Sequence, residues 1–444
     1  MGRYVIGADV GTTGTKAMLF DESGKILRRA YQGYPLLRED GRINQRAEDW
    51  YTALCATVRE VVGDADPACV EAICLSTQGG ALVWADEAFA PICTANSWMD
   101  SVEGSEYADL KETETDFRGI TGWNLGGWST MAKLHVWSDK GARWILSTVD
   151  WLNAKLTGRA AIDPSNAAMQ CLYDVRKRDW DETLCGYAGI KKDQLPEIVA
   201  SGEPVGNLTG AAAEDMGLTE RTVVLSGGHD QYCAAYGAGV REEGDMILSG
   251  GTSWVSVAFG HEISDYAASW GMHLTEQLYG ALTSIGTAGA SMEWACRMGG
   301  FSLEEANKAA AEVNDAPVFV PGFGKGGAKL LGLEIDHGAG AVVRAVMEGV
   351  AFEERHVVDS FGTLRNVFAN GGASKSELWM QILADALGRP ITVIHEKDMA
   401  CLGAGRLAAK YAGIDTDEAF ESHQVLPKTD LSAKYAEYLE VRNG

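Results

Sequence analysis

Several short segments of this chain carry side chains that could bind phosphate and move a proton. Residues 7–16 read Gly-Ala-Asp-Val-Gly-Thr-Thr-Gly-Thr-Lys and lie between two apolar runs. This pattern predicts a strand, a tight glycine turn and a second strand. Gly11 lets backbone N–H groups approach an anion without a Cβ in the way, and Thr12 and Thr13 add hydroxyl donors. We count these three residues, and Lys16 directly after the turn, as candidate nucleotide-binding residues.

Asp9 stands at the end of the first predicted strand, directly before the glycine turn. A carboxylate repels a bare phosphate, but a divalent cation between the two groups removes the repulsion. We therefore interpret the segment as a site for a nucleoside triphosphate with Mg²⁺, in which Asp9 faces the metal. The alternative is an ordinary hairpin whose strand happens to end on an acidic residue.

A second segment places a carboxylate at the end of a predicted buried strand. The apolar residues 222–226 are followed by Gly-Gly-His-Asp-Gln, which ends on Asp230 and Gln231. In α/β folds, ligands bind at the carboxyl ends of such strands. Asp230 could accept the proton of a hydroxyl that attacks phosphorus, and such a base contributes about 10²–10⁴ in rate. The alternative is that Asp230 caps the helix expected over 231–238, and we take His229 as a bystander.

Residues 246–259 repeat the strand, glycine turn and strand of the first segment, with Gly251, Thr252 and Ser253 in the turn. The repeat indicates two related domains, each with its own phosphate turn, and a break at 239–244. Chance recurrence of such a short unit is the alternative.

A fourth segment, residues 369–377, contains Gly371, Gly372, Ala373 and Ser374. A diglycine before a helix offers a surface for a base, a ribose or a diphosphate. Ser374 and Glu377 have the spacing of a capping box, so we expect the helix to begin at Ser374 and to end at Gly388. The small residues in 401–409 predict a helix whose backbone packs closely against a neighbouring helix.

Composition restricts the classes of function. A chain of 444 residues predicts two domains of about 200 residues each. A formal charge of −24 argues against nucleic acid or an anionic membrane as partner. The nine cysteines form no C-x-x-C pair, which favours reduced thiols and a cytoplasmic location. No apolar run approaches the length of a membrane span. The apolar pattern predicts a helix over 47–62 and helical structure through 131–157.

Taken in order, these segments resemble the FGGY carbohydrate kinase family, and the resemblance runs from about residue 4 to about residue 412. It is carried by residues 9–13, 78–80, 98–100, 150–152, 156–158, 228–231, 249–253, 347–352 and 371–373. Their order and spacing identify the family, although no single motif does so.

The resemblance implies an α/β fold with two actin-like (ribonuclease H-like) domains, residues 1–240 and 241–444, and an ATP cleft between them. It implies transfer of the γ-phosphoryl group of ATP to a sugar hydroxyl. Asp230 would be the general base, and Asp9 and Asp230 would hold Mg²⁺. The turns at 11–13 and 251–253 would bind phosphates, and residues 371–374 the adenosine end. Closure of the two domains would exclude water, and a homodimer is the expected assembly.

By position, the resemblance also implies which residues contact the substrate. These are Gln78, Gly79, Trp98, Asp230 and Gln231, with Trp128 near another contact.

The sequence departs from the family pattern where the sugar would bind. Gly79 and Gly80 stand where glycerol kinases carry an Arg-Glu pair, and the histidine of xylulokinases is also missing. Our hypothesis is that the two glycines leave room for a larger or differently oriented sugar. We expect a ketose such as a xylulose-like pentulose. A polyol, a sugar acid, or a non-catalytic ATP-binding role as a sugar sensor or a chaperone are the alternatives. Residues 319–327 are short and glycine-rich where relatives carry a longer segment.

Overall fold

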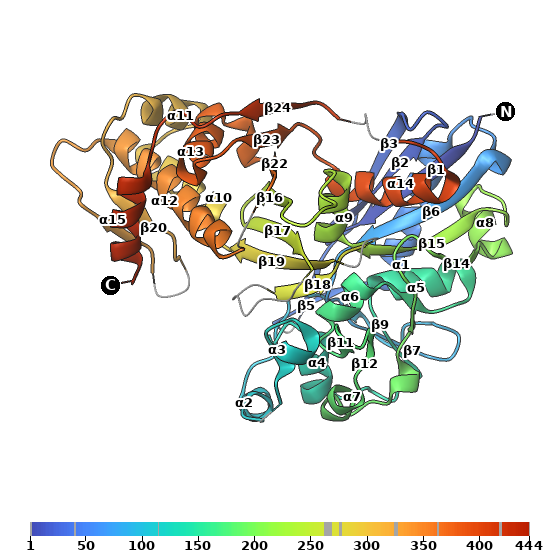
Figure 1. Ribbon diagram of the computed structural model, residues 1–444. Coiled ribbons are helices and arrows are strands. Elements are labelled where there is room, and N and C mark those ends of the chain that lie inside the picture. Colours follow the sequence, from blue (N-terminus) through green and yellow to red (C-terminus); the bar gives the residue numbers. More distant parts are fainter. Residues whose placement is uncertain are drawn as a thin grey trace.

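The chain forms two α/β lobes, each built around its own sheet (Figure 1). The computed structural model describes residues 2–39, 41–113, 115–261, 269–274, 278–323, 327–361, 364–416 and 420–443. The short segment 319–327, singled out in the sequence, lies partly outside the described residues, because 324–326 are not among them.

The first sheet has six strands in the order β14-β15-β6-β1-β2-β3. Its strands are β1 (Tyr4–Val10), β2 (Gly14–Phe20), β3 (Ile26–Gly33), β6 (Val70–Thr77), β14 (Pro204–Asn207) and β15 (Val223–His229). Strands β1, β6 and β15 are parallel neighbours, with Asp9 opposite Ser76 and His229 opposite Thr77. The carboxyl ends of these three strands therefore meet at one edge of the sheet.

The second sheet has seven strands in the order β18-β19-β17-β16-β22-β23-β24. Its strands are β16 (Met246–Gly250), β17 (Trp254–Gly260), β18 (Ser269–Met272), β19 (Tyr279–Ile285), β22 (Val367–Gly371), β23 (Ile391–Ile394) and β24 (Ser422–Val425). Strands β16 and β22 are parallel, with Gly250 opposite Gly371. The two glycine turns expected to hold the nucleotide therefore leave the sheet side by side.

Helices cover both sheets and build the smaller part below the first sheet in Figure 1. The α-helices are α1 (Ala47–Val62), α2 (Ser105–Lys111), α3 (Phe117–Thr121), α4 (Thr130–Trp137), α5 (Thr148–Thr157), α6 (Pro164–Met169), α7 (Glu182–Tyr187), α8 (Gly210–Met216), α9 (Asp230–Gly237), α10 (Ala288–Gly299), α11 (Leu303–Ala311), α12 (Ala339–Ser360), α13 (Glu377–Leu387), α14 (Met399–Ala412) and α15 (Ser432–Asn443). Short 3₁₀ turns span Pro67–Cys69, Lys192–Gln194 and Ala373–Lys375.

Short strands pair outside the two main sheets. They are β4 (Leu37–Glu39), β5 (Arg42–Gln45), β7 (Val83–Ala85), β8 (Ala95–Asn96), β9 (Trp144–Leu146), β10 (Ala161–Ile162), β11 (Tyr173–Asp174), β12 (Asp179–Trp180), β13 (Glu197–Ile198), β20 (Val318–Val320) and β21 (Lys329–Leu331).

Helix α14 lies late in the chain, yet it packs against β1, β6 and α9 of the first lobe (Figure 1). Small residues allow this close approach. A Cβ on Gly403 would lie 1.8 Å from the carbonyl oxygen of Cys233, and one on Gly7 would lie 2.3 Å from the nitrogen of Gly405. The expected small-residue helix is confirmed.

Helix α1 has the predicted bounds, but two other expectations are wrong. Residues 131–157 are not one helical stretch, because Trp144 and Ile145 lie in β9, which pairs with β7. The cap of α13 is Ser376, whose Oγ accepts from the Trp379 N–H at 3.1 Å. Ser374 instead lies in a 3₁₀ turn and donates its hydroxyl to the Gly371 carbonyl at 2.7 Å. The tighter turn takes up two residues that the sequence pattern assigned to the helix.

Candidate active site

Two carboxylates meet at the edge where the parallel strands of the first sheet end. Asp9 is the penultimate residue of β1 and is 8% exposed, and Ser76 of β6 donates its hydroxyl to Asp9 Oδ1 at 2.8 Å. Asp230 opens α9 directly after β15, and 30% of its side chain is exposed. Asp230 is not the residue that caps α9, since His229 holds that position. The fold therefore leaves the Asp230 carboxylate available for chemistry.

The electrostatics of these two groups are linked. Burial, and then the negative charge of Asp230, raise the pKa of Asp9 to about 6. Burial likewise raises the pKa of Asp230 to about 6, against the opposing effects of hydrogen bonds from Gln231 and the charge of Lys16. Both carboxylates are therefore harder to ionise than a free aspartate. A divalent cation bound beside them would stabilise their charged forms.

Lys16 of β2 lies beside this pair. Burial disfavours its charge, but Asp9 and Asp398 together hold its pKa above the usual value. Its Nζ lies 3.1 Å from Asp398 Oδ1, directly before α14. One ammonium group therefore connects the carboxylate edge with a segment from the second half of the chain.

The residues fit a magnesium ion, because carboxylate oxygens are its preferred protein ligands. Among the residues that the structure describes, no group of three or more His, Cys, Asp or Glu side chains could hold a metal. An ion at Asp9 and Asp230 would thus take most of its coordination from phosphate oxygens and water, as Mg²⁺ commonly does.

His229 is closer to the site than the sequence suggested. Its Nε2 lies 3.1 Å from Asp230 Oδ1, and its side chain is buried. Its backbone N–H donates to Ser165 Oγ at 2.9 Å. Burial lowers the pKa of His229 to about 4, so the imidazole is neutral at pH 7 and can offer one N–H.

The glycine turn after β1 is held by its neighbours. The Gly11 N–H donates to the Gly14 carbonyl at 3.0 Å, which closes the turn. Tyr34 donates its backbone N–H to the Thr13 carbonyl at 3.0 Å and its hydroxyl to the Gly11 carbonyl at 2.6 Å. These hydrogen bonds therefore fix the backbone conformation of the turn before a phosphate binds.

Two residues expected to contact the sugar reach this turn. Trp98 Nε1 donates to Thr12 Oγ1 at 2.9 Å. Gln78, which is buried, donates Nε2 to Gln45 Oε1 at 3.0 Å. Gln45 in turn donates to the Thr12 carbonyl at 2.8 Å. Sequence reasoning missed Gln45, because a lone glutamine at a strand end carries no signal.

The space beside Gly79 is filled, which contradicts the idea that this glycine enlarges the sugar site. A Cβ on Gly79 would lie 2.2 Å from Met169 Sδ and 2.8 Å from His229 Cδ2. Gly80 has a φ of 70°, a backbone conformation that favours glycine. Close packing at one position and backbone shape at the next therefore explain the two glycines.

A buried lysine ties two walls of this region together. Lys133 of α4 is fully buried, and its Nζ donates to the Ser97 carbonyl at 2.8 Å and lies 3.5 Å from the Gly80 carbonyl. Burial lowers the pKa of Lys133 to about 7. Beside them, the Trp128 ring packs edge-on against Trp123 at 5.5 Å. Trp123 is a core residue, which leaves Trp128 as the more exposed aromatic.

The second sheet contributes a pocket of about 630 Å³. It is lined by Gly251, Thr252, Gly372 and Ala373, all expected at the nucleotide, and by side chains of α10 and α11. Ser253 and Ser374 do not line it, and their hydroxyls donate to the carbonyls of Gly286 and Gly371. The added lining residues, which the sequence did not indicate, include Met292, Glu293, Cys296, Arg297 and Asn307.

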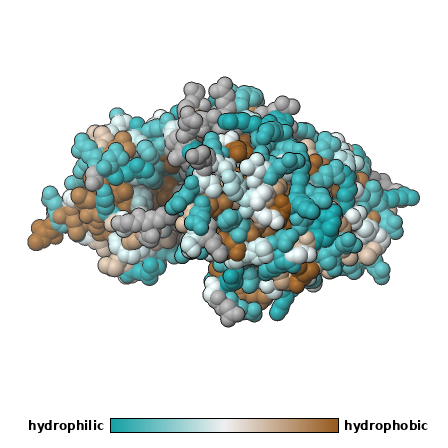
Figure 2. Space-filling view, turned by 90° about the horizontal axis from the view of Figure 1, so that it is seen from below, coloured by the Kyte–Doolittle hydropathy of each residue, from teal (hydrophilic) through white to brown (hydrophobic). Residues whose placement is uncertain are grey.

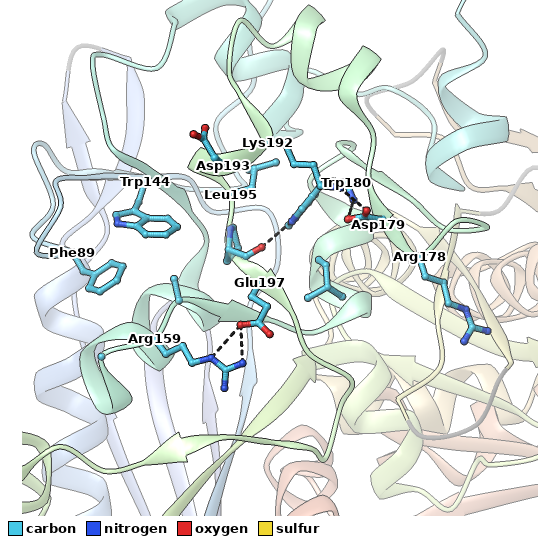
Figure 3. Close-up of a pocket in the computed structure, with 14 residues that line it drawn as sticks. Phe89, Trp144, Arg159, Arg178, Asp179, Trp180, Lys192, Asp193, Leu195 and Glu197 are labelled. Atoms are coloured by element: carbon cyan, nitrogen blue, oxygen red, sulfur yellow. Dashed lines mark hydrogen bonds and ion pairs between the residues drawn. The ribbon is translucent and has the colours of Figure 1, made fainter.

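A larger cavity, of about 870 Å³, lies elsewhere on the first lobe (Figure 3). Phe89 and Trp144 lie together on one side, and the Arg159–Glu197 and Lys192–Asp179 ion pairs are among the lining residues. Since none of the residues expected to bind sugar or nucleotide lines this cavity, we do not regard it as the active site.

The face of the molecule seen in Figure 2 is mainly hydrophilic, with apolar residues in separate groups. Among the described residues, no helix is both long and apolar enough to cross a membrane. All nine cysteines are free thiols.

The two lobes have the two-domain α/β fold of solved sugar kinase structures. The crystal structure of xylulose kinase from Rhodospirillum rubrum superposes with a TM-score of 0.94 at 23% identity, covering 99% of this chain and 98% of that one. The fold class expected from the sequence is confirmed.

The chain belongs to the FGGY family of carbohydrate kinases. Residues 4–237 match the N-terminal domain of the family and residues 247–412 match its C-terminal domain. Xylulose kinase of Bacillus subtilis (strain 168) is 26% identical over 93% of this chain and 89% of that protein. Autoinducer-2 kinase of Enterobacter sp. (strain 638) is 27% identical over 99% and 92%. The protein is a carbohydrate kinase, and its family implies ATP as co-substrate.

Proposed function

We propose that this enzyme transfers the γ-phosphoryl group of ATP, with Mg²⁺, to a hydroxyl of a ketose of the xylulose-like pentulose class. The observation that carries the proposal is the pair Asp9 and Asp230: Asp9 lies in β1, Asp230 follows β15 on the other side of β6, and the charge of Asp230 contributes to the raised pKa of Asp9. Phosphoryl transfer needs a metal-bound triphosphate and a carboxylate that receives the proton of the attacking hydroxyl. In this proposal one aspartate holds the metal of the triphosphate, and the other receives the proton.

In this proposal Asp230 is the general base. At pH 7 the carboxylate is mostly ionised, since its pKa is about 6. A base whose pKa lies near the working pH combines availability with driving force for proton transfer. The neutral His229 holds one face of the carboxylate, and Gln231 contributes hydrogen bonds to Asp230 and a contact to the sugar.

Asp9 would orient the magnesium ion, which neutralises charge on the transferring phosphoryl group. Lys16 and the N–H groups of Thr12 and Thr13 would hold the phosphate oxygens, since the Gly11 N–H already closes the turn. In the second lobe, the turns at 251–253 and 371–374 would bind the remaining phosphates and the adenosine, with Gly251, Thr252, Gly372 and Ala373 facing the 630 Å³ pocket. We place the domain boundary between residues 240 and 241, with α14 as the helix of the second domain that packs on the first.

The ketose is proposed because xylulose kinases are among the relatives. Gln78, Trp98 and the Gly79 backbone would form the sugar site. A polyol or a sugar acid is the alternative acceptor, since a glycerol kinase is among the relatives and a gluconate kinase among the similar structures. The cytoplasmic location and the homodimer expected from the sequence remain predictions.

An ADP-release assay tests the function. The panel contains D-xylulose, D- and L-ribulose, L-fuculose, L-rhamnulose, gluconate, erythritol and glycerol, each with and without Mg²⁺. We expect one ketose to give Mg²⁺-dependent turnover far above the background of ATP hydrolysis.

The Asp230→Asn variant is the matched control, since it keeps the side-chain shape and removes the basic oxygen. We expect its kcat to fall about 10²–10⁴-fold, with ATP binding by calorimetry within a few-fold of the unmodified enzyme. A panel without turnover, or full turnover in Asp230→Asn, would refute the proposal.

A further inference from the structure

A buried glutamine spans the distance between the proposed sugar site and the phosphate turn. Gln45 ends β5 and is 1% exposed. Its Oε1 accepts from Gln78 Nε2 at 3.0 Å, and its Nε2 donates to the Thr12 carbonyl at 2.8 Å. The amide oxygen of Gln45 is therefore bonded on the side of the proposed sugar site, and its amide nitrogen on the side of the phosphate turn.

A second contact reaches the same turn residue. Trp98 Nε1 donates to Thr12 Oγ1 at 2.9 Å, while 43% of the Trp98 residue is exposed. Thr12 thus receives one hydrogen bond at its carbonyl and one at its side chain, and both lead to residues on the sugar side.

Gln78 has an unused hydrogen-bond acceptor. Its Oε1 is buried and has no hydrogen-bond partner within the described part of the chain. A buried acceptor without a partner is costly, and a sugar hydroxyl that donates to it would remove that cost. Such a bond would also strengthen the next donor along the chain, because hydrogen bonds in series polarise one another.

We infer that Gln45 is a positioning residue that couples the two substrates, so that a sugar bound at Gln78 stabilises the Thr12 conformation that binds the phosphates of ATP. This inference rests on the proposed function. Coupling of this kind is reciprocal: the sugar tightens nucleotide binding by the same factor by which the nucleotide tightens sugar binding. Its benefit is that ATP is held for transfer mainly when an acceptor is present.

Two substitutions of Gln45 distinguish this role from simple packing. A side chain that only filled space could be replaced by an apolar one of equal size. Gln45→Met keeps the length of the side chain and removes both hydrogen bonds. Gln45→Asn keeps an amide that is one methylene too short to reach both Gln78 and Thr12.

Calorimetry in the presence of Mg²⁺ measures the coupling. The Kd of the panel sugar with the highest turnover is determined with and without saturating non-hydrolysable ATP analogue, and the Kd of the analogue with and without the sugar. In the unmodified enzyme we expect each ligand to tighten the other about 5-fold or more. In Gln45→Met and Gln45→Asn we expect a factor of about 1–2, with the Kd of the analogue alone changed less than 3-fold.

Gln194→Met is the control. Gln194 also uses both ends of its amide, with Nε2 bonded to Asp139 and the Ala142 carbonyl and Oε1 to the Lys191 N–H, but it lies away from the site. It should keep the full coupling factor. If Gln45→Met does not fold, which its melting curve reveals, Gln45→Asn gives the result.

Two outcomes overturn the inference: no coupling in the unmodified enzyme, or undiminished coupling in a folded Gln45 variant. Both leave the proposed function intact, since sugar turnover is measured separately. If no sugar of the panel is phosphorylated, the proposed function fails first and the inference fails with it.

Discussion

At the scale of single residues, the site depends on keeping two carboxylates close together. The pKa values of Asp9 and Asp230 both lie near 6, above the usual value for aspartate, because Asp9 is buried, Asp230 is partly buried, and Asp9 also faces the charge of Asp230. The native state therefore binds protons at these groups more tightly than the unfolded chain does. Their ionisation above about pH 6 costs stability, a cost that disappears as the pH falls toward 4. Such a loss of stability is typical of functional sites, where the charged groups take part in the reaction.

These pKa values predict the pH dependence of the reaction. Both carboxylates must be ionised, one to hold the cation and one to take the proton. We expect kcat/KM for the sugar to be constant above about pH 7 and to fall as the pH drops through 6, by about tenfold or more per unit at the acid end. The measurement is the ADP-release assay in buffers from pH 5 to 8 at constant ionic strength. An unchanged kcat/KM at pH 5 would contradict these assignments.

At the scale of elements, the contact between α9 and α14 places Asp230. Helix α9 begins with Asp230, and α14 crosses it where Gly403 faces the carbonyl oxygen of Cys233. The two backbones can approach this closely only because no side chain lies between them. The position of the carboxylate that we propose as the base thus depends on a glycine from the far end of the chain.

We therefore expect Gly403→Ala to be destabilising. The added Cβ would lie 1.8 Å from backbone that cannot yield locally, so α9 must shift. Overpacking of this kind costs about 1–3 kcal/mol, and the shift should also lower kcat. Thermal melting and the kinetic assay measure the two effects.

Gly186→Ala is the matched control for this prediction. Gly186 lies in α7 with nothing within 4 Å of a Cβ. The change should leave stability and kcat the same or slightly raise stability, because alanine is the better helix former. Equal effects of Gly186→Ala and Gly403→Ala would contradict the proposed role of the α9–α14 contact.

At the scale of the whole molecule, the proposed reaction needs groups from both halves of the chain. The first lobe holds the two carboxylates, and the second holds the pocket proposed for the nucleotide. Lys16 and Arg29 of the first sheet pair with Asp398 and Glu396 of the second half, at 3.1 and 2.5 Å. A cation between the triphosphate and Asp9 would add a further connection across the cleft.

Metal dependence tests this arrangement. Removal of Mg²⁺ by a chelator should abolish transfer, and added Mg²⁺ should restore it. In Asp9→Asn, we expect the Mg²⁺ concentration for half-maximal activity to rise about tenfold or more, since one unit of ligand charge is lost. Glu304→Gln, at an exposed carboxylate on α11, is the control and should respond as the unmodified enzyme does. A normal Mg²⁺ response in Asp9→Asn would refute the assignment.

The sequence by itself determined the family and the fold class, and it supplied the chemical groups that we propose for the reaction. Glycine turns bounded by apolar runs, and an aspartate at a strand end, are local patterns whose meaning follows from backbone sterics and charge. The turn after β1, the strand before Asp230 and the whole of α1 could be predicted for this reason.

Only the tertiary structure decided which distant residues serve the site. Met169 fills the space beside Gly79, and Asn307 lines the 630 Å³ pocket of the second lobe, although no spacing in the chain connects either to its partner. Gln45 reaches Thr12 and Gln78 because β5 ends beside both, and His229 turned out to contact Asp230 rather than stand apart. Such contacts arise when separate strands and helices are packed together. A pattern read along the chain records the local backbone, whereas the side chains that complete a site are chosen by proximity in space.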